Sequence, residues 1–545
     1  MLADVTITEK SFGPKTLMSG VRFSVNDREK VGVIGRNGVG KSTLFGILTG
    51  ADKDYSGEII FKRGTVVAAT QQEHHDVGDT TVLQYVLAGL PEYSGLSHII
   101  ETYPETMGNN MRMITQYTDA LQRFDDKGFY QIEEQIEREL DNFQLSGVAH
   151  NPFATLSGGQ KRLVEVIKIM HSDAHLALID EPTNHMDYVA KAQFIDWLRQ
   201  ASEAALVITH DRDVLREVDR IIEIKDGGCA SFKGNYDAYL RQNAVSTSSQ
   251  MNEFEMVEKR IANLKVKVLE YQRLKEKARN PATIQKFKRL EETSRGELAE
   301  LQAKEKPTFW IDKESASNLH YKAASQYQKF KAPNVRINLK NDASRSKHVL
   351  VAARDLSLGY DQPLFKDVQI DLREGEALEI RGRNGAGKTT LIKALLGSTA
   401  ATNYSGEITV DKQVRVGVYE QEVSKRYFDL PLMTAIERIY LDRDLAINNT
   451  KVRGLMHDYL FSEEDGHIPV SRLSGGQKAR VQLIAMLANN PELLILDEPT
   501  NHLDLPSIEE LESALSKYSG AILYVSHDGY FCKAIGGMVL QIGKK

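Results

Sequence analysis

Short runs of consecutive apolar residues, each followed by a polar or glycine-rich turn, dominate the chain. Clear examples are residues 31–34, 176–179, 204–208 and 493–496. Uninterrupted apolar strands of this length are typical of a parallel β-sheet that is covered by helices on both faces. A helix is expected soon after the first run, over residues 42–48. The pattern therefore predicts an α/β fold with a doubly wound core.

The predicted core is present twice, because four motifs recur in the same order. Three of the pairs share a spacing of 317 residues, whereas the first pair is 347 residues apart. The first copy therefore contains about 30 extra residues, which the positions of Gln72 and Gln421 place near 88–128. The motifs are GRNGVGKS (35–42) and GRNGAGKT (382–389), LSGGQ (156–160 and 473–477), DEPTNH (180–185 and 497–502), and His-Asp (210–211 and 527–528).

The first motif has the composition of a phosphate-binding loop. Its glycines allow backbone N–H groups to turn toward phosphate oxygens, and the N-terminus of the following helix adds a partial positive charge. We expect Lys41 to reach the β- and γ-phosphates and the Ser42 hydroxyl to bind Mg²⁺. The expected nucleotide-binding residues of the two loops are Gly35, Asn37, Gly38, Gly40, Lys41, Ser42 and Thr43, and Gly382, Asn384, Gly385, Gly387, Lys388, Thr389 and Thr390.

Acidic residues at the ends of two apolar runs are suited to the hydrolysis of a bound nucleotide. An aspartate at the end of each strand is placed to hold Mg²⁺, directly or through water. The glutamate that follows it is a candidate general base for an attacking water. A histidine after a later β-rich run is suited to contact the γ-phosphate. These residues are Asp180, Glu181 and His210 in the first copy, and Asp497, Glu498 and His527 in the second.

A phosphate loop, a glutamine, LSGGQ, Asp-Glu and a histidine, in this order, resemble the ATP-binding cassette (ABC) ATPases. In that family two cassettes pair head to tail, and each ATP is held by the phosphate loop of one cassette and the LSGGQ of the other. The resemblance implies that Lys41 shares a nucleotide with Ser474 and Gly476, and that the second phosphate loop shares one with the first LSGGQ. Neither copy lacks a motif residue, so we expect two hydrolysis-competent sites.

The same resemblance implies further contacts with the nucleotide and its metal. The two glutamines are expected at the metal and the nucleotide, and two aromatic residues are expected to stack on adenine rather than serve as ordinary loop residues. The residues concerned are Ser157, Gly158, Gly159 and Gln160, Ser474, Gly475, Gly476 and Gln477, Gln72 and Gln421, and Phe12 and Tyr360.

The composition excludes several other classes of protein. Hydrophobic residues make up 41% and charged residues 26% of the chain, which is ordinary for folded domains. With only Cys229 and Cys532, a disulfide framework, a cysteine-rich zinc site or an iron–sulfur cluster is excluded, and a reducing cytosol is favoured. The apolar runs are shorter than the roughly 20 residues that cross a bilayer, and no signal peptide is visible. We therefore expect a cytoplasmic protein without a membrane partner.

The net charge of −6 conceals a strongly basic segment. Residues 258–348 contain 22 Lys and Arg against 11 Asp and Glu, a local balance of +11 that leaves −17 on the rest of the chain. Such asymmetry predicts a segment that meets a polyanion, attached to an acidic body.

The basic segment contains a predicted helical hairpin. Apolar residues of its first half are spaced three and four residues apart, as in a heptad seam. Asn280 and Pro281 then suit the cap and the first residue of a second helix, which is expected to run to about Lys304. The expected apolar faces are Phe254, Val257, Ile261, Leu264, Val268 and Tyr271 on the first helix, and Ile284, Phe287, Leu290, Leu298 and Leu301 on the second.

The turn of this hairpin has an unusual charge. Residues 271–290 hold seven basic residues against one acidic residue, Glu276. A solvated coiled coil normally mixes both signs, so we favour a nucleic-acid-binding tip over that alternative. The expected RNA-binding residues are Arg273, Lys275, Lys277, Arg279, Lys286, Lys288 and Arg289.

Tandem cassettes, a charged helical linker and extra residues in the first cassette together resemble the ABC-F subfamily over the whole chain. The resemblance implies a translation factor that binds the ribosomal tRNA exit site in its ATP state. Its hairpin would point at the peptidyl-site tRNA and at the large-subunit rRNA of the peptidyl-transferase centre, and hydrolysis would release it. The residues near 88–128 look like the family's arm, whose acidic character favours a ribosomal protein or solvent over RNA.

Several roles stay open. Antibiotic resistance by ribosome protection and housekeeping relief of stalled ribosomes both fit, and we lean slightly to resistance. A DNA-repair or DNA-maintenance ATPase would suit the basic hairpin, but the zinc modules and very long coiled coils of such proteins are missing. The ATPase subunit of a membrane transporter would leave the hairpin without a role.

These patterns predict the organisation of the chain. We expect a first cassette over 1–242, a linker over 243–347 with its hairpin at about 251–306, and a second cassette over 348–545. The two cassettes would pair within one chain, so we expect a monomer that uses ATP and Mg²⁺.

Overall fold

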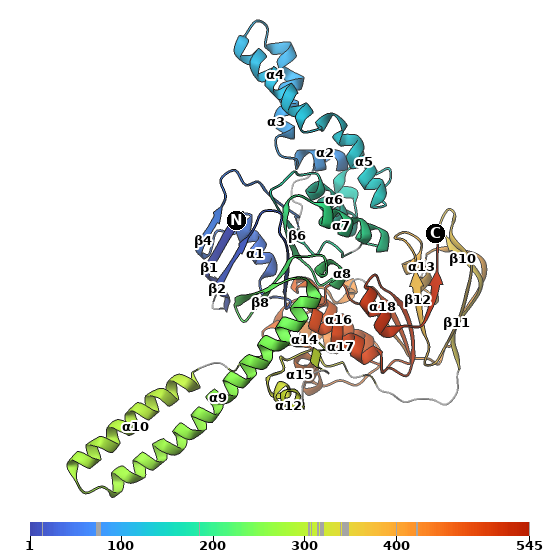
Figure 1. Ribbon diagram of the computed structural model, residues 1–545. Helices are drawn as coiled ribbons and strands as arrows, with labels where there is room; N and C mark the ends of the chain where they lie inside the picture. Colours follow the sequence, from blue (N-terminus) through green and yellow to red (C-terminus); the bar gives the residue numbers. More distant parts are fainter. Residues whose placement is uncertain are drawn as a thin grey trace. The chain divides into compact units, whose positions relative to one another are not determined.

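The structure is a computed structural model in which the described chain divides into two compact units. The first unit comprises Met1–Tyr236 with Val335–Lys545, and the second comprises Asp237–Asn334. Both copies of the repeated core belong to the first unit, and the linker helices belong to the second (Figure 1). The residues described are 1–13, 15–71, 78–184, 186–303, 306, 308–312, 315–316, 321–337, 339, 348–398, 400–420 and 423–543.

The first copy is built on a mainly parallel sheet with the strand order β5-β6-β7-β3-β8-β9. Neighbouring strands are parallel except β8 and β9, which form an antiparallel pair. The predicted α/β core with buried parallel strands is confirmed. The strands are β3 (Lys30–Gly35), β5 (Val67–Ala69), β6 (Leu176–Asp180), β7 (Ala204–Ile208), β8 (Arg220–Lys225) and β9 (Gly228–Lys233).

Helices cover both faces of this sheet, which explains the uninterrupted apolar runs. Successive residues of a strand point to opposite faces. Leu178 of β6 belongs to the hydrophobic cluster that contains α1 (Lys41–Leu48). Its neighbour Ile179 belongs to the cluster that contains α6 (Gly158–Met170) and α7 (Tyr188–Gln200). The apolar residues of β6 are therefore buried, whichever way they point.

The second copy repeats this arrangement. Its parallel sheet has the order β14-β15-β16-β12-β17. Its helices include α13 (Lys388–Leu395), α16 (Gly475–Leu487), α17 (Leu505–Leu515) and α18 (Gly529–Ile535). The strands are β12 (Ala377–Arg381), β14 (Val416–Tyr419), β15 (Leu493–Asp497), β16 (Ala521–Val525) and β17 (Met538–Gln541).

Each copy also has an antiparallel sheet that the sequence analysis did not identify. The strand orders are β2-β1-β4 and β11-β10-β13. Val5 and Ile7 of β1 are fully buried against α1, while polar residues alternate with them. This weak alternation is less visible than a continuous apolar run. The strands are β1 (Ala3–Phe12), β2 (Lys15–Val25), β4 (Ser56–Phe61), β10 (Val349–Gly359), β11 (Pro363–Arg373) and β13 (Thr402–Val410).

The extra residues of the first copy form a helical pair. The ring of Tyr93, at the start of α3 (Tyr93–Thr106), lies 5.7 Å from that of Phe124 in α4 (Met111–Asp126). Figure 1 shows the two helices as a hairpin. The flanking helices are α2 (Val82–Ala88) and α5 (Ile132–Asn142), and the second copy has α14 (Leu432–Leu441) and α15 (Asn449–Asp458) in the corresponding stretch.

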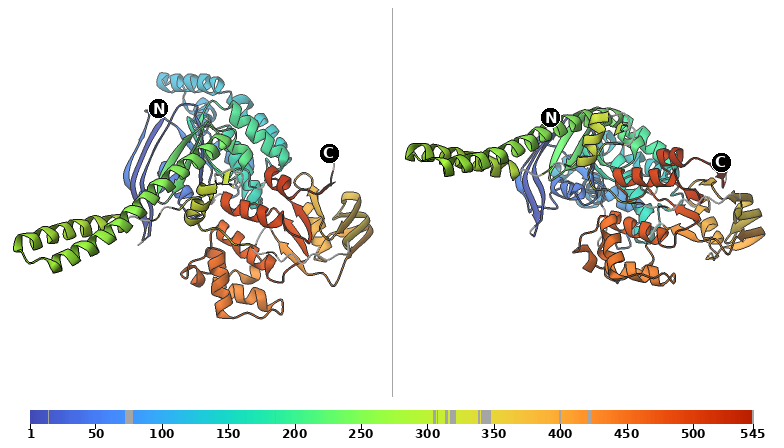
Figure 2. Two further views of the ribbon diagram at one scale, coloured as in Figure 1. Left: turned by 60° about the horizontal axis from the view of Figure 1, so that its bottom comes forward. Right: turned by 90° about the horizontal axis from the view of Figure 1, so that it is seen from below.

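The second unit contains the predicted helical hairpin. Helix α9 (Tyr236–Lys277) is followed by α10 (Pro281–Gln302), which returns beside it in every view (Figures 1 and 2). The Asn280 side chain accepts a hydrogen bond of 2.9 Å from the Ala282 amide, so the predicted cap is confirmed. The seam residues Leu264 and Val268 are buried, as the heptad spacing requires.

The predicted apolar face of α10 needs a correction. Ile284 and Leu290 are exposed, although they were expected to face α9. The inward position is taken by Glu291, which is buried and ion-paired with Lys275 at 2.5 Å and with Arg295 at 2.9 Å. Two cations compensate the buried carboxylate. An ion-paired acidic residue therefore takes a buried position on α10 that the apolar spacing did not predict.

A small hydrophobic core lies within the second unit. Met251 of α9 and Phe330 of α12 (Tyr321–Phe330) pack with Phe309, Ile311 and Tyr327. The Tyr327 hydroxyl accepts a hydrogen bond of 2.9 Å from the Ile311 amide, so its polar end is satisfied. Among the described helices, none is both long and apolar enough to span a membrane.

Phe330→Ala should destabilise the second unit selectively. Phe330 is 2% exposed, and removal of a buried Phe side chain costs about 3–5 kcal/mol. For a unit of this size the midpoint of its thermal transition should fall by roughly 10 °C or more. Differential scanning calorimetry checks this, with Met256→Ala as the control because Met256 is 71% exposed on the same unit. Equal midpoints for the two variants would contradict this packing.

Candidate nucleotide-binding sites

Three neighbouring strands bring the catalytic motifs of each copy together. In the first copy β6, β7 and β3 are adjacent and parallel, so their carboxyl ends lie at one edge of the sheet. The phosphate loop follows β3, Asp180 ends β6, and His210 follows β7. The crevice outside the carboxyl ends of parallel strands is the usual ligand site of such folds.

Each phosphate loop needs glycine at its end. Gly40 precedes α1 with a φ of 105°, and a Cβ there would lie 2.8 Å from the Leu17 side chain. Gly387 precedes α13 with a φ of 95°, and a Cβ there would lie 3.0 Å from Phe365. The left-handed conformation and the close neighbour exclude other residues. The backbone can therefore turn closely around a phosphate group.

The loop lysines bind their own loops in this structure. The Lys41 ammonium donates to the Gly35 carbonyl at 2.6 Å, and the Lys388 ammonium donates to the Gly382 carbonyl at 2.9 Å. Both lysines are nearly fully buried, and burial lowers the pKa of each ammonium. A bound phosphate would offer these buried ammonium groups a stronger, charged acceptor than a carbonyl.

The expected metal ligands lie next to each other in both copies. The Ser42 hydroxyl donates a hydrogen bond of 2.8 Å to Asp180, and the Thr389 hydroxyl donates one of 2.9 Å to Asp497. Hydroxyl and carboxylate oxygens are hard donors of the kind that Mg²⁺ prefers in phosphate sites. The arrangement therefore suits a magnesium ion that is held together with nucleotide phosphates.

The glutamate and histidine of each copy form a matching pair. His210 Nε2 lies 3.5 Å from Glu181 Oε1, and His527 Nε2 lies 3.3 Å from Glu498 Oε1. Both glutamates adopt a left-handed conformation, with φ of 48° and 52°. Such backbone strain in a non-glycine residue is concentrated at functional sites, and here it recurs at both equivalent positions.

Burial controls the protonation of these pairs. Burial raises the pKa of the Glu181 carboxyl and, against the opposing effect of Lys388, raises the pKa of Glu498 to about 7. Burial and the charge of Lys41 lower the pKa of His210, and burial and Lys388 lower the pKa of His527 to about 4. A glutamate poised near neutrality beside a neutral histidine suits a general base and a hydrogen-bonding partner.

The LSGGQ motifs begin helices α6 and α16 with capping boxes. The Ser157 side chain accepts from the Gln160 amide, and the Gln160 side chain accepts from the Ser157 amide. Ser474 and Gln477 form the same pair in the second copy. The side-chain carbonyl of each glutamine thus serves the helix, whereas each serine lies at a helix N-terminus, where anions are favoured.

The phosphate loop of each copy meets the other copy. The Asn37 side chain donates to the His502 carbonyl at 2.7 Å, and the Asn37 amide donates to Asp504 at 3.3 Å. A Cβ on Gly476 would lie only 2.0 Å from Asn37, so the second LSGGQ lies directly against the first phosphate loop. On the other side, the Asn384 amide donates to Asp187 at 3.1 Å.

Asp187 and Asp504 are contact residues that the sequence analysis missed. Each caps the helix after the DEPTNH motif, and each bonds the opposite phosphate loop. A signal was present, because the two aspartates lie at the same spacing of 317 residues as the neighbouring motifs.

The remaining predicted residues occupy varied positions. Phe12 and Tyr360 are 56% and 54% exposed. The Lys10 ammonium lies 4.7 Å from the Phe12 ring centre. Gln72 and Gln421 lie outside the described residues. Thr43 and Thr390 lie in the first turns of α1 and α13.

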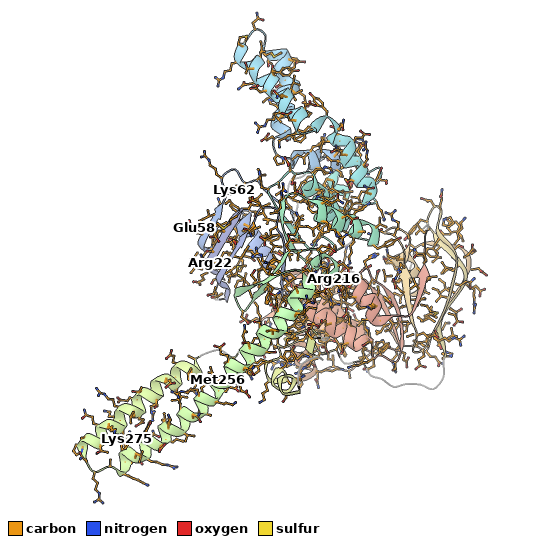
Figure 3. The ribbon with its side chains drawn as sticks, viewed as in Figure 1. Arg22, Glu58, Lys62, Arg216, Met256 and Lys275 are labelled. Carbon is orange, nitrogen blue, oxygen red and sulfur yellow. The ribbon has the colours of Figure 1, made fainter. Side chains whose placement is uncertain are left out.

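The basic tip of the hairpin presents most of its cations to solvent. Lys275 lies on α9 near the turn (Figure 3) and is held by Glu291. The exposed tip cations are Arg273, Lys277, Arg279, Lys286, Lys288 and Arg289.

Comparison with protein families gives two matches. A family described as "ABC transporter" matches residues 18–184 and 365–501, which include both phosphate loops. A second family with the same description matches residues 222–311, which include most of the hairpin.

Several curated proteins are similar over nearly the whole chain. The putative ATP-binding protein YdiF of Bacillus subtilis is 30% identical, over 99% of this chain and 80% of its own. The energy-dependent translational throttle protein EttA of Mycobacterium tuberculosis is 30% identical, over 96% of this chain and 88% of its own. The ribosome protection protein VmlR of Bacillus subtilis is 28% identical, over 97% and 84%.

A solved structure supports the fold. The archaeal ribosome recycling factor aABCE1, in complex with the stalk protein aP1, superimposes with a TM-score of 0.55 over 99% of this chain and 87% of its own. Its sequence identity is 16%, so this likeness concerns the fold alone.

Gly476→Ala should impair ATP hydrolysis far more than Gly475→Ala. A Cβ on Gly476 would overlap Asn37 of the opposite loop, whereas a Cβ on Gly475 would meet His502 at an ordinary distance of 3.4 Å. Steady-state ATPase assays on both variants compare the two positions. We expect at least a tenfold lower rate for Gly476→Ala than for Gly475→Ala. Equal rates would contradict the close approach of the two copies.

The ATPase rate should depend on pH through the buried glutamates. A general base must be ionised. Because burial raises the pKa of Glu181 to about 8 and that of Glu498 to about 7, this form is lost as pH falls through these values. The histidines have lowered pKa values and remain neutral from pH 6 to 8. We therefore expect kcat/KM for ATP to rise between pH 6 and 8. ATP affinity at each pH is the control, and a flat profile would contradict the assignment.

Proposed function

This chain belongs to the ATP-binding cassette ATPases of the ABC-F type and hydrolyses ATP, and on that premise we propose that it is a ribosome-binding translation factor. The observation that carries the proposal is the helical hairpin, whose turn presents six exposed cations. Such a tip suits RNA, because phosphates are neutralised by clustered lysine and arginine. The names of two relatives, a translational throttle and a ribosome protection protein, agree with this partner.

Hydrolysis in the first site would proceed between the two copies. Ser42 and Asp180 would hold Mg²⁺, which when bound neutralises charge on the phosphates. Lys41 would exchange its loop carbonyls for phosphate oxygens. Glu181 would accept a proton from the attacking water, while the neutral His210 donates a hydrogen bond to the γ-phosphate. Lys388, Thr389, Asp497, Glu498 and His527 would have the same roles in the second site.

ATP would act by favouring the closed pair of cassettes. Gly476 lies against Asn37, so a γ-phosphate on the first loop would contact the LSGGQ of the second copy as well. A ligand shifts a conformational equilibrium only by its difference in affinity for the two states. Because only the closed pair completes both phosphate sites, ATP supplies that difference, and hydrolysis removes it. We propose that the closed form binds the ribosome and that the open form leaves it.

The hairpin would direct this binding to a functional centre. We propose that the chain, acting as a monomer in the cytoplasm, occupies the tRNA exit site and points its tip at the peptidyl-site tRNA and the peptidyl-transferase rRNA. Between the two biological roles we lean to ribosome protection against antibiotics over relief of stalled ribosomes. The turn itself is short, at residues 278–280, so an effect on a drug through the tRNA is favoured over direct contact.

Ribosome co-sedimentation tests the proposal. The variant with Glu181→Gln and Glu498→Gln lacks both general bases and should hold the closed state with ATP. We expect it to pellet with ribosomes at least tenfold more in ATP than in ADP. No pelleting in either nucleotide, with ATP binding intact, would contradict the proposal, and DNA binding in its place would favour a DNA-maintenance ATPase.

Charge reversal within the hairpin gives this test a matched control. Lys286→Glu with Lys288→Glu at the tip should weaken ATP-dependent pelleting several-fold and reduce its salt dependence. Lys259→Glu with Lys265→Glu removes the same charge at exposed positions farther from the turn. Equal losses of pelleting in the two double variants would indicate unspecific electrostatic attraction to the ribosome rather than binding by the tip.

A further inference from the structure

Two aspartates of like charge, Asp211 and Asp528, line one pocket where the cassettes meet. Asp211 follows His210, and Asp528 follows His527, and each caps the short helix after it. Burial raises the pKa of Asp211 against the opposing charge and hydrogen bond of Lys191, and the charge of Asp528 adds to the rise. Like charges in a buried place are unfavourable unless cations compensate them.

Two buried cations described at this place belong to the first cassette. Lys191 of α7 is 6% exposed, and its ammonium lies 2.8 Å from Asp211 and 2.6 Å from Asp213. Arg212 is also buried and forms an ion pair of 2.9 Å with Glu512 of the second cassette. Its guanidinium lies 5.0 Å from the ring centre of Tyr530, again in the second cassette.

Lys191 also reaches across to the second ATP site. Its ammonium donates a hydrogen bond of 3.4 Å to the backbone carbonyl of His527. A single side chain thus joins the loop after His210 to the histidine of the other site. One pocket is lined by Lys191 together with the glutamate, histidine and aspartate of both sites: Glu181, His210 and Asp211, and Glu498, His527 and Asp528.

Among the described residues, the position of the second cassette that corresponds to Lys191 carries no cation. The repeat spacing of 317 residues pairs Lys191 with Ile508, which is buried and apolar. The same spacing pairs Arg212 with Gly529. The interface is therefore asymmetric in charge, although the two sets of catalytic motifs are alike.

We propose that Lys191 is a positioning residue of the second ATP site, where it holds the His527 segment in place from the first cassette. The inference rests on the proposed assignment of the two ATP sites. The His210 segment is held within its own cassette, where Lys191 pairs with Asp211 at 2.8 Å and the Lys41 ammonium lies 3.1 Å from the His210 ring. Ile508, at the equivalent position of the second cassette, cannot donate a hydrogen bond to that segment. The two sites therefore differ in whether this position of the opposite cassette contacts the segment of their γ-phosphate histidine.

The electrostatics of the second site agree with this role. Lys388 and, more weakly, Lys191 oppose the rise in the pKa of Glu498 that burial causes. Lys191 also helps to lower the pKa of His527, after burial and Lys388. In the first site, Lys41 and Arg162 oppose the rise in the pKa of Glu181 that burial causes. The pKa of His210 is lowered by burial and Lys41 and raised by Asp504. The charge of Lys191 therefore acts on the second catalytic pair.

Site-selective kinetics test the proposal in the full chain. Glu181→Gln leaves turnover to the second site, and Glu498→Gln leaves it to the first. Lys191→Met, which keeps the length of the side chain and removes its charge, should lower kcat in the Glu181→Gln background about tenfold. KM for ATP should stay within twofold there, and kcat in the Glu498→Gln background should change less than threefold. Lys191→Arg, which keeps the charge and the donors, should restore most of the loss.

Ile508→Met is the matched control, because it places the same side chain at the equivalent position of the second cassette. It should leave both backgrounds within twofold of their parent rates. Equal losses at both sites on Lys191→Met would overturn the proposal and indicate a general effect on the interface. An unchanged rate at the second site would overturn it as well.

A second measurement covers the case in which neither single-site variant turns over, which would count against independent sites rather than against Lys191. In the double Glu→Gln variant with ATP, Lys191→Met should raise amide deuterium uptake in peptides that cover residues 526–529. Uptake over the first phosphate loop, residues 35–42, should stay unchanged. No increase over 526–529 would overturn the proposal by this route.

Discussion

The contact between the phosphate loop of one cassette and the helix cap of the other is the interaction on which both sites depend. Asp504 bonds the Asn37 amide, and Asp187 bonds the Asn384 amide. Each aspartate also caps the helix that follows its own DEPTNH motif. Each aspartate thereby joins a helix end of its own cassette to the phosphate loop of the other. The same contact brings Gly476 against Asn37, where any larger residue would collide.

Burial at this interface sets the chemistry as well as the geometry. The glutamates and histidines are largely buried, and burial raises the pKa of both carboxyls and lowers the pKa of both imidazoles. Two lysines, Lys41 and Lys388, are buried among them and are satisfied by carbonyls of their own loops. Such groups are costly to bury without a partner, and a polyphosphate is the partner that would compensate them best. The two buried ammonium groups therefore favour the binding of a negatively charged ligand at this interface.

The sequence predicts those parts of the molecule that are specified by residues close together in the chain. The repeated motifs and the continuous apolar strands gave the core sheets, and Asn280 with Pro281 gave the hairpin turn, because each rests on neighbouring residues. The antiparallel sheets were missed, since strands such as β1 alternate weakly and gain their burial from α1. The prediction that Ile284 and Leu290 face α9 was wrong, because the buried position is taken by Glu291, which pairs with Lys275.

Contacts between the copies were the least accessible from sequence. Lys191 and Arg212 resemble ordinary surface cations in the chain, and only the fold places them against His527 and Glu512. Motifs that are alike in both copies could not show that both of these cations belong to the first cassette. Residues that act across an interface carry no local pattern, although the repeat spacing shows where the two copies differ.

The central claim is that ATP closes the two cassettes on each other. Pulsed electron paramagnetic resonance between spin labels at Arg63 and Lys412, two exposed positions in different cassettes, measures this directly once Cys229 and Cys532 are replaced. In the double Glu→Gln variant, the account predicts one short, narrow distance distribution with ATP and a longer, broader one with ADP. Identical distributions in both nucleotides, with binding verified, would contradict it.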